Sequence, residues 1–111
     1  MNEINTDSSD SSNLAFLVRH WGRTNQITGP DGQGTIGGQY KKLLEEVGEL
    51  GQALMEDNAC ELIDSIGDCA VVLILLADMQ GLRFEGCLRD AYDVIKQRTG
   101  RMEDGVFVKD A

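Results

Sequence analysis

The sequence has few of the residues that build β-sheets and few that bind nucleic acid. Aromatic residues make up 5% of its 111 residues, and there is a single proline. This composition disfavours a β-sandwich, which uses β-branched and aromatic residues between regular turns. Ten lysines and arginines stand against 19 aspartates and glutamates, for a net charge of −9. Because no basic stripe is present, we expect no binding to a nucleic-acid polymer.

Signals for export, membrane insertion and zinc binding are also missing. The most apolar run, Cys69–Ala77, is far too short to span a bilayer, and residues 1–12 are acidic and serine-rich, unlike a secretion signal. The three cysteines, Cys60, Cys69 and Cys87, do not have the spacing of zinc ligands. We interpret them as reduced core residues and expect a cytoplasmic protein without membrane association.

The pattern of apolar residues predicts one all-α domain over residues 13–100. Residues 1–12 are low in complexity, which predicts a disordered N-terminal arm. Residues 101–111 form a C-terminal tail, in which a short extended piece, Val106–Val108, is expected to lie on a neighbouring surface. The four expected helices cover residues 13–25, 39–56, 58–80 and 84–99.

The apolar stripes of these helices indicate a protein that associates with itself. The second half of the third helix is hydrophobic all round, and such a helix is buried on every side. Four short helices rarely enclose one of their number completely, so we expect a homodimer or homotetramer. The residues expected to face the core are Leu14, Leu17, Val18 and Trp21 in the first helix, Leu43, Leu44, Val47, Leu50 and Leu54 in the second, and Leu88, Ala91, Tyr92 and Ile95 in the fourth.

A glycine-rich segment, residues 28–38, separates the first two helices. It holds five of the thirteen glycines and the only proline, but it lacks the G-x-x-x-x-G-K-[ST] pattern of a phosphate-binding loop. We expect a mobile loop. A lid over a site and a plain connector are equally consistent with it.

Acidic residues cluster on one sector of the second helix and on one stripe of the third. If these helices pack antiparallel, the two clusters converge, and only cations make such a convergence tolerable. Ligation by oxygen alone selects Mg²⁺, with Mn²⁺ as the other candidate. Either cluster alone would be a solvated face, but three glycines inside the same helices suggest close backbone approach and favour a metal site. The acids are Glu45, Glu46, Glu49, Glu61, Asp64 and Asp68, and the glycines are Gly48, Gly51 and Gly67.

Two segments resemble the signature of a known enzyme family. Residues 42–50 (KLLEEVGEL) and residues 61–68 (ELIDSIGD) are similar to the E-E-x-x-E and E-x-x-D motifs of the MazG-like, all-α nucleoside triphosphate pyrophosphohydrolases. The resemblance covers residues 14–100. It implies a four-helix bundle, subunit association, Mg²⁺, and cleavage of an NTP or dNTP to the monophosphate and pyrophosphate, with house-cleaning of the nucleotide pool as a candidate role.

The resemblance assigns roles to individual acids. Glu46 and Glu49 match the metal-binding acids of the first motif, Glu45 its leading acid, and Asp68 the aspartate of the second motif. The glutamate expected in the second motif falls on Ser65. Asp64 or Glu61 could replace it, and we favour Asp64, because it lies one turn from Asp68 on the same face. Either Glu45 or Glu46 would be the catalytic base that deprotonates the attacking water.

Cations and one aromatic residue complete the expected site. Lys42, Lys96 and Arg98, with Arg101, could hold phosphate oxygens. Lys42 could equally pair with Glu46 one turn away, and the other three could simply favour a helix C-terminus. Trp21 could stack on a base, although a tryptophan is more often a core residue.

Two other functions stay open. Phosphoribosyl-ATP pyrophosphohydrolases share the fold and the metal chemistry. A helical dimerisation or regulatory module that has lost activity is the second alternative, and Ser65 in place of a glutamate favours it.

Overall fold

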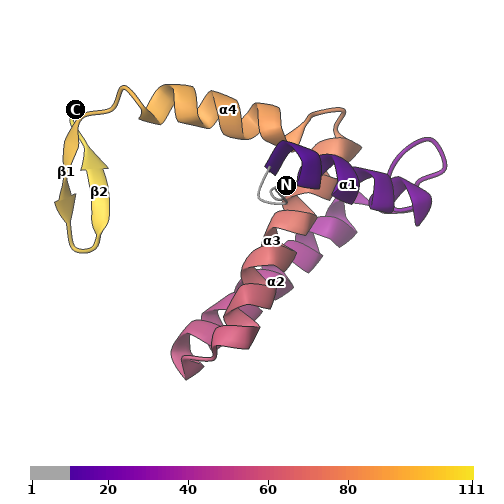
Figure 1. The fold of residues 1–111 in the computed structure, drawn as a ribbon, viewed down its shortest axis with the longest axis horizontal. Coiled ribbons are helices and arrows are strands. Elements are labelled where there is room, and N and C mark those ends of the chain that lie inside the picture. Colours follow the sequence, from indigo (N-terminus) through magenta and orange to yellow (C-terminus); the bar gives the residue numbers. More distant parts are fainter. Residues whose placement is uncertain (1–10) are drawn as a thin grey trace, which may run out of the picture.

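The computed structural model describes residues 11–111, which form four helices followed by two short strands (Figure 1). Residues 1–10 of the predicted arm lie outside the described part, and Ser11 and Ser12 already belong to the first helix. The chain is mostly helical, as expected. The elements are α1 (Ser11–Thr24), α2 (Ile36–Glu56), α3 (Ala59–Met79), α4 (Phe84–Ile95), β1 (Gly100–Glu103) and β2 (Val106–Lys109).

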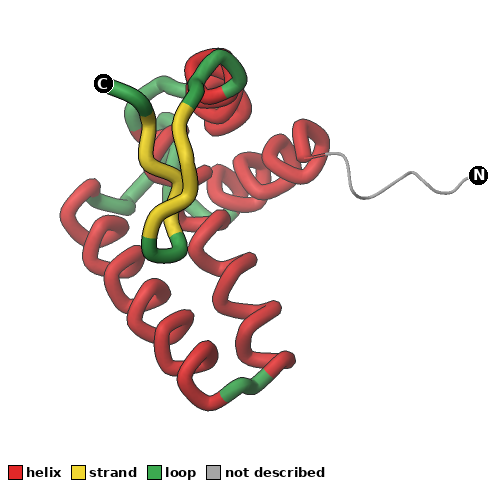
Figure 2. The backbone as a smooth tube through the Cα atoms, turned by 90° about the vertical axis from the view of Figure 1, so that its left-hand side faces the viewer, coloured by secondary structure: helices red, strands yellow, loops and turns green. Residues whose placement is uncertain are grey.

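Helices α2 and α3 pack against each other as an antiparallel pair, the α2–α3 hairpin (Figure 2). The turn between them is short because both helix ends are capped locally. Asp57 ends α2 in the left-handed conformation, with φ of 52°. The side chain of Asn58 then accepts a hydrogen bond of 3.1 Å from the amide of Glu61 and starts α3. Two polar residues therefore reverse the chain and fix the register of the two helices.

Helix α1 lies against α3 through small residues and one arginine. Ala15, Arg19 and Gly22 are its buried positions. A Cβ atom on Gly22 would lie 2.5 Å from Cδ2 of Leu75, so glycine is what lets the two helices approach. The sequence prediction for this helix was largely wrong, since Leu14 is 44% exposed and Leu17 and Trp21 are each 50% exposed. Because α1 packs closely on α3, only small side chains fit between the two helices. The larger apolar side chains of α1 are therefore exposed.

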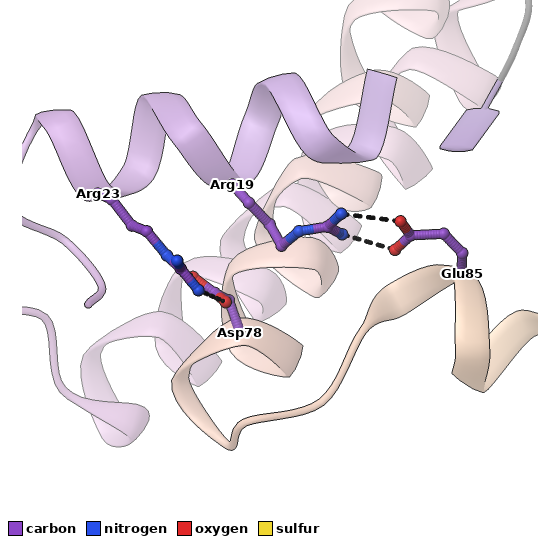
Figure 3. Close-up of polar contacts among 4 residues, drawn as sticks. All are labelled: Arg19, Arg23, Asp78 and Glu85. Carbon is purple, nitrogen blue, oxygen red and sulfur yellow. Dashed lines mark hydrogen bonds and ion pairs between the residues drawn. The ribbon is translucent and has the colours of Figure 1, made fainter. Parts of the chain in front are cut away.

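Two ion pairs fasten α1 to the rest of the chain (Figure 3). The Arg19 guanidinium donates two hydrogen bonds to Glu85, of 2.6 and 2.8 Å. Arg23 donates two to Asp78, of 3.1 and 2.7 Å. Both pairs have the two-pronged geometry that makes arginine–carboxylate contacts strong. They link α1 to the end of α3 and to the first turn of α4.

These ion pairs predict that the fold is sensitive to acid. Arginine hydrogen bonds lower the pKa of both Asp78 and Glu85 below their ordinary values. Each carboxylate therefore contributes stability that is complete above the unfolded pKa of about 4 and is lost as pH falls through the lower folded pKa. Urea unfolding at pH 7 and at pH 3 should show this loss. In the double variant Asp78→Asn, Glu85→Gln the free energy of unfolding should be lower at pH 7 and should change less between the two pH values.

The core of the described chain is small for its length. Its buried apolar residues are only Ala15, Ala53, Val72, Ile74 and Leu75. The radius of gyration is 16.5 Å, whereas a compact domain of this size has about 13 Å. Several residues expected in the core are not buried within one chain. Leu73 of α3 is 41% exposed and α4 has no buried residue, and of the three free cysteines only Cys69 is partly buried.

The tail is a β-hairpin and not one extended piece. Strands β1 and β2 pair antiparallel, with Arg101 opposite Val108. Asp104 and Gly105 both have positive φ, 50° and 85°, as the favoured two-residue hairpin turn requires. The predicted extended piece, Val106–Val108, lies within β2, but the hairpin packs against none of the described helices.

The glycine-rich segment folds back on itself. The amide of Gly34 donates to the carbonyl of Ile27, and the amide of Gly32 to that of Gly29. A Cβ atom at Gly32 or Gly34 would lie within 2.7 Å of backbone atoms of Thr28 or Ile27, so these glycines serve close backbone contact. Helix α2 begins three residues earlier than predicted, at Ile36, after an N-cap at Thr35. This structure favours the connector over the lid.

Candidate metal centre on the α2–α3 hairpin

The acids and the exposed apolar residues lie on opposite sides of the α2–α3 hairpin. Each helix faces the other with a stripe of buried and half-buried positions, which we call the facing stripe. It consists of Leu43, Glu46, Leu50 and Ala53 in α2 and Leu62, Ser65, Cys69 and Val72 in α3. One residue along a helix is a rotation of 100°. When two right-handed helices pack antiparallel, the residues that directly follow the facing positions lie on the same side of the pair in both helices. The residues that directly precede the facing positions lie on the opposite side.

The residues that directly precede the facing stripe include acids on both helices. The residues that directly follow it include large apolar side chains on both helices. We call the first set the acidic face, Glu45, Glu49, Glu61, Asp64 and Asp68. We call the second set the apolar face, Leu44, Val47, Leu54, Ile63, Ile66 and Leu73, whose exposed fractions range from 41% to 72%. The two predicted acidic clusters therefore do lie on one side of the hairpin, where each is largely open to solvent.

Glu46 differs from the other acids because it lies on the facing stripe. It is 4% exposed. Its Oε2 atom lies 3.1 Å from Nζ of Lys42, but its Oε1 atom is buried with no hydrogen-bond partner in the described chain. A buried carboxylate oxygen without a partner costs free energy. A cation between the two helices would remove that cost.

Negative charge is also concentrated around the neighbouring carboxylate, that of Glu49. The pKa of Glu49 is raised above its ordinary value, first by the negative charge of Glu46, with Asp68 on α3 adding to it. Like charges that raise a carboxyl pKa are a feature of functional sites. The largest cause of the raised Glu49 pKa therefore comes from the same helix, and a smaller one comes from Asp68 on α3.

The remaining predicted ligands are less well defined. Asp64 and Glu61 are exposed on the acidic face, next to Asp68. Ser65 is 3% exposed, on the facing stripe. Within residues 11–111 no three His, Cys, Asp or Glu side chains are arranged closely enough to hold a metal ion as they stand. The donor set still fits Mg²⁺ chemically, because it consists of carboxylates and includes the unpartnered oxygen of Glu46.

Lys42 is engaged with the acids. Its Nζ atom lies 3.1 Å from Glu46 and 4.0 Å from Glu45. The prediction of an i, i+4 pair with Glu46 is therefore confirmed. A phosphate-binding role for Lys42 stays a prediction.

The other cations lie away from the acidic face, and Trp21 lies on α1, where it is 50% exposed. Helix α4 ends at Ile95, earlier than predicted, so Lys96 is its C-cap and Arg98 lies beyond it. Lys96 pairs with Asp93 at 3.0 Å and lies 5.7 Å from the centre of the Tyr92 ring. Figure 1 shows α4 and the strands leading away from the α2–α3 hairpin. Within one chain, the structure does not bring these cations to the acids.

The interior glycines do not serve close approach within this chain. A Cβ atom at Gly48, Gly51 or Gly67 would meet nothing within 4 Å in the described structure. The expectation that these glycines let α2 and α3 approach was wrong. The residues that do allow it are on the facing stripe, where Ala53, Ser65 and Cys69 are small.

Sequence reasoning missed a second cluster of charged residues, around α1. A hollow of about 310 Å³ is lined by residues that include Arg19, His20, Arg23 and Arg83. Two of the three arginines already bind carboxylates, as described above. The signal in the sequence was Arg19 and Arg23, one turn apart on a different side of the helix from its expected apolar stripe.

No helix in residues 11–111 has the length and apolarity needed to cross a membrane. Set against known protein families, curated proteins and solved structures, the chain matches none of them.

Proposed function

We propose that this protein is a Mg²⁺-dependent nucleoside triphosphate pyrophosphohydrolase that acts on an NTP or a dNTP. One observation carries the proposal: Glu46 is buried between two helices with an unpartnered carboxylate oxygen, beside Glu49 and Asp68. A chain that only needed a stable helix pair would place an apolar residue there. The proposed reaction is based on the resemblance of the two sequence motifs that contain these residues to those of the pyrophosphohydrolases.

The proposed roles follow from where the side chains lie. Glu46, Glu49 and Asp68 would hold Mg²⁺ (or Mn²⁺), with Asp64 favoured and Glu61 available as further ligands. The bound ion would neutralise the triphosphate and lower the pKa of a water molecule. Glu45 is exposed beside Lys42 at the edge of this group and would take a proton from the attacking water. Attack at the α-phosphorus would release pyrophosphate.

The test is pyrophosphate release from a panel of NTPs, dNTPs and phosphoribosyl-ATP, with Mg²⁺ and with EDTA. Release should require Mg²⁺ and should vanish in Glu49→Ala. Asp90→Ala is the matched control, because Asp90 is an exposed acid on α4 outside the acidic face. Release only from phosphoribosyl-ATP would identify that nucleotide as the substrate. No release from any nucleotide by a folded protein would end the proposal.

An inactive dimerisation or regulatory module is the second candidate. The absence of three converged ligands in residues 11–111, together with buried Ser65, favours it. Thermal unfolding with and without Mg²⁺ separates the two. A bound ion at 100 times its dissociation constant stabilises the folded state by about 2.7 kcal/mol, whereas a solvated acidic face responds only to ionic strength.

We further propose that the protein is a homodimer or homotetramer joined through the apolar face. Six large apolar side chains on one side of two helices form an exposed patch of the kind that marks an interface. Gly51 lies among them, with open space around it, as a contact with another helix would require. Four helices, two from each copy, would then enclose the core that one chain lacks.

Val47→Glu should therefore convert the protein to a monomer. A carboxylate at this position would have to be buried in the interface without a partner, at a cost of several kcal/mol. Sedimentation velocity at micromolar concentration measures the result, with Lys41→Glu, on an outward position of the same helix, as the control. A wild-type protein that is already monomeric would refute the proposed interface.

A further inference from the structure

Positive side chains gather in a hollow between α1 and the start of α4, although the chain has a net charge of −9. We call it the α1–α4 hollow. Its lining includes Arg19, Arg23, Arg83 and Asp78, and its volume is about 310 Å³. Glu85, the partner of Arg19, is the second carboxylate beside these arginines. Three cations against two carboxylates leave an excess of one positive charge there.

The two ion pairs leave some donors of these arginines available. Arg23 donates to Asp78 through Nε and Nη2, so its Nη1 atom has no partner in that pair. Arg83 is exposed at the N-cap of α4, where its side chain makes no capping hydrogen bond. It forms no ion pair in the part of the chain that the structure describes. Because a guanidinium binds phosphate oxygens through parallel N–H groups, both side chains can receive an anion.

The charges around the hollow show why an anion would be stabilised there. The hydrogen bond to Glu85 raises the pKa of Arg19, whereas the positive charge of Arg23, one turn away, lowers it. In Figure 3 both arginines extend from α1 toward the segment that joins α3 to α4, and Arg83 belongs to that segment. Each carboxylate already neutralises one arginine, so an anion would be attracted by the third without displacing an ion pair.

An apolar and aromatic wall lies beside these cations. Phe16 and His20 of α1 stack, with ring centres 6.5 Å apart and ring planes inclined by 19°. Both rings line the hollow together with Leu82, and Phe16 and Leu82 are 53% and 54% exposed. Inorganic phosphate would leave this wall in water, whereas an organic group joined to the phosphate would cover it. The volume is at the low end of the range for ligand sites, about 300 to 1,000 Å³, so the molecule must be small.

We propose that the α1–α4 hollow binds a small phosphate monoester. The phosphate contacts Arg83 and the Nη1 atom of Arg23, and the organic group packs on Phe16 and Leu82. Because these residues come from α1 and from the segment before α4, the bound molecule would add a further link between the two elements. The inference does not rest on the proposed function, since the residues that line the hollow are not those of the acidic face.

NMR titration with phenyl phosphate, without Mg²⁺, tests the site directly. His20 is the only histidine in the chain, so its ring signals report on the hollow. Phenyl phosphate should shift these signals saturably, and Arg83→Gln should weaken binding about tenfold, because a charge-assisted hydrogen bond is lost. Arg89→Gln is the matched control, because Arg89 is an exposed arginine of α4 that lines a different hollow. Equal effects of the two variants, or no saturable shift, would overturn the proposal.

Further comparisons separate the two parts of the ligand. Phenol and inorganic phosphate should each bind about tenfold more weakly than phenyl phosphate. Phe16→Ala should weaken the binding of phenyl phosphate more than that of inorganic phosphate. Phenyl phosphate should also raise the melting temperature of the wild type more than that of Arg83→Gln. Both side chains are exposed, so both variants should fold. Phenol that binds as well as phenyl phosphate would refute the phosphate contact, and inorganic phosphate that binds as well would refute the organic group.

Discussion

Replacement of Glu46 by glutamine should strongly reduce catalysis while leaving the metal-free protein at least as stable as the wild type. A metal-held charge contributes several kcal/mol to a phosphoryl-transfer transition state, so loss of a ligand should lower kcat/KM about 1000-fold, equivalent to roughly 4 kcal/mol. In the metal-free protein, by contrast, the change removes a buried charge with an unpartnered oxygen. A neutral amide is less costly to bury. Activity and stability should thus move in opposite directions.

A structural measurement checks the reason for this result. The charge of Glu46 is the largest cause of the raised pKa of Glu49, so that pKa should fall toward its ordinary value in Glu46→Gln. Carbon-13 NMR titration of the glutamate carboxyl groups reports it directly. If Glu46 were only a structural partner of Lys42, the variant would lose stability and keep the Mg²⁺-dependent rise in melting temperature. That pattern would count against the metal centre.

Replacement of Arg19 by methionine should have the largest effect on stability of any change outside the facing stripe. Arg19 is 6% exposed, and its carboxylate partner is 23% exposed. Removal of one member of a buried ion pair costs about 3 to 5 kcal/mol. Because Glu85 keeps some contact with water, we expect about 2 to 3 kcal/mol, or a fall in melting temperature of at least 8 °C. Differential scanning calorimetry measures both quantities.

A double-variant cycle shows whether this loss belongs to the pair. Arg19→Met combined with Glu85→Met replaces both charges by side chains that can pack together. The double variant should recover at least half of the stability that Arg19→Met loses, with a coupling energy above about 1 kcal/mol. Additive losses would mean that Arg19 acts through its packing on α3 and not through Glu85.

The helices themselves could be predicted from the sequence because their apolar periodicity is strong. Their ends could be predicted less well. Helix α4 stops at Ile95 because the chain must enter the β-hairpin, and the Asp104–Gly105 dipeptide was the overlooked signal for that hairpin. The buried side of α1 could not be predicted from hydrophobicity, because Ala15 and Gly22 are buried for their small size.

The candidate site was predictable in part. Motif spacing placed the acids on one side of two helices. It did not distinguish Glu46, which is buried, from Glu45, which is exposed. Whether Glu45 or Glu46 is buried depends on which residues of α2 face α3. Glu45 and Glu46 are adjacent, so a difference of one residue in the facing stripe exchanges their environments. The distant position of Arg98 depends on the direction in which α4 leaves α3, which local periodicity does not encode.

The separation of acids and apolar residues onto opposite sides of one hairpin has a consequence for how the protein can evolve. Under the proposed function, a substitution among the exposed acids would change affinity for a cation or a substrate and would leave the proposed subunit contacts intact. A substitution among Leu44, Val47 or Ile66 would change the proposed assembly and would leave the acids in place. Only Glu46 and Ser65, on the stripe shared by both sides, link the two properties. If both proposals hold, selection can adjust chemistry and assembly as nearly independent traits of the same two helices.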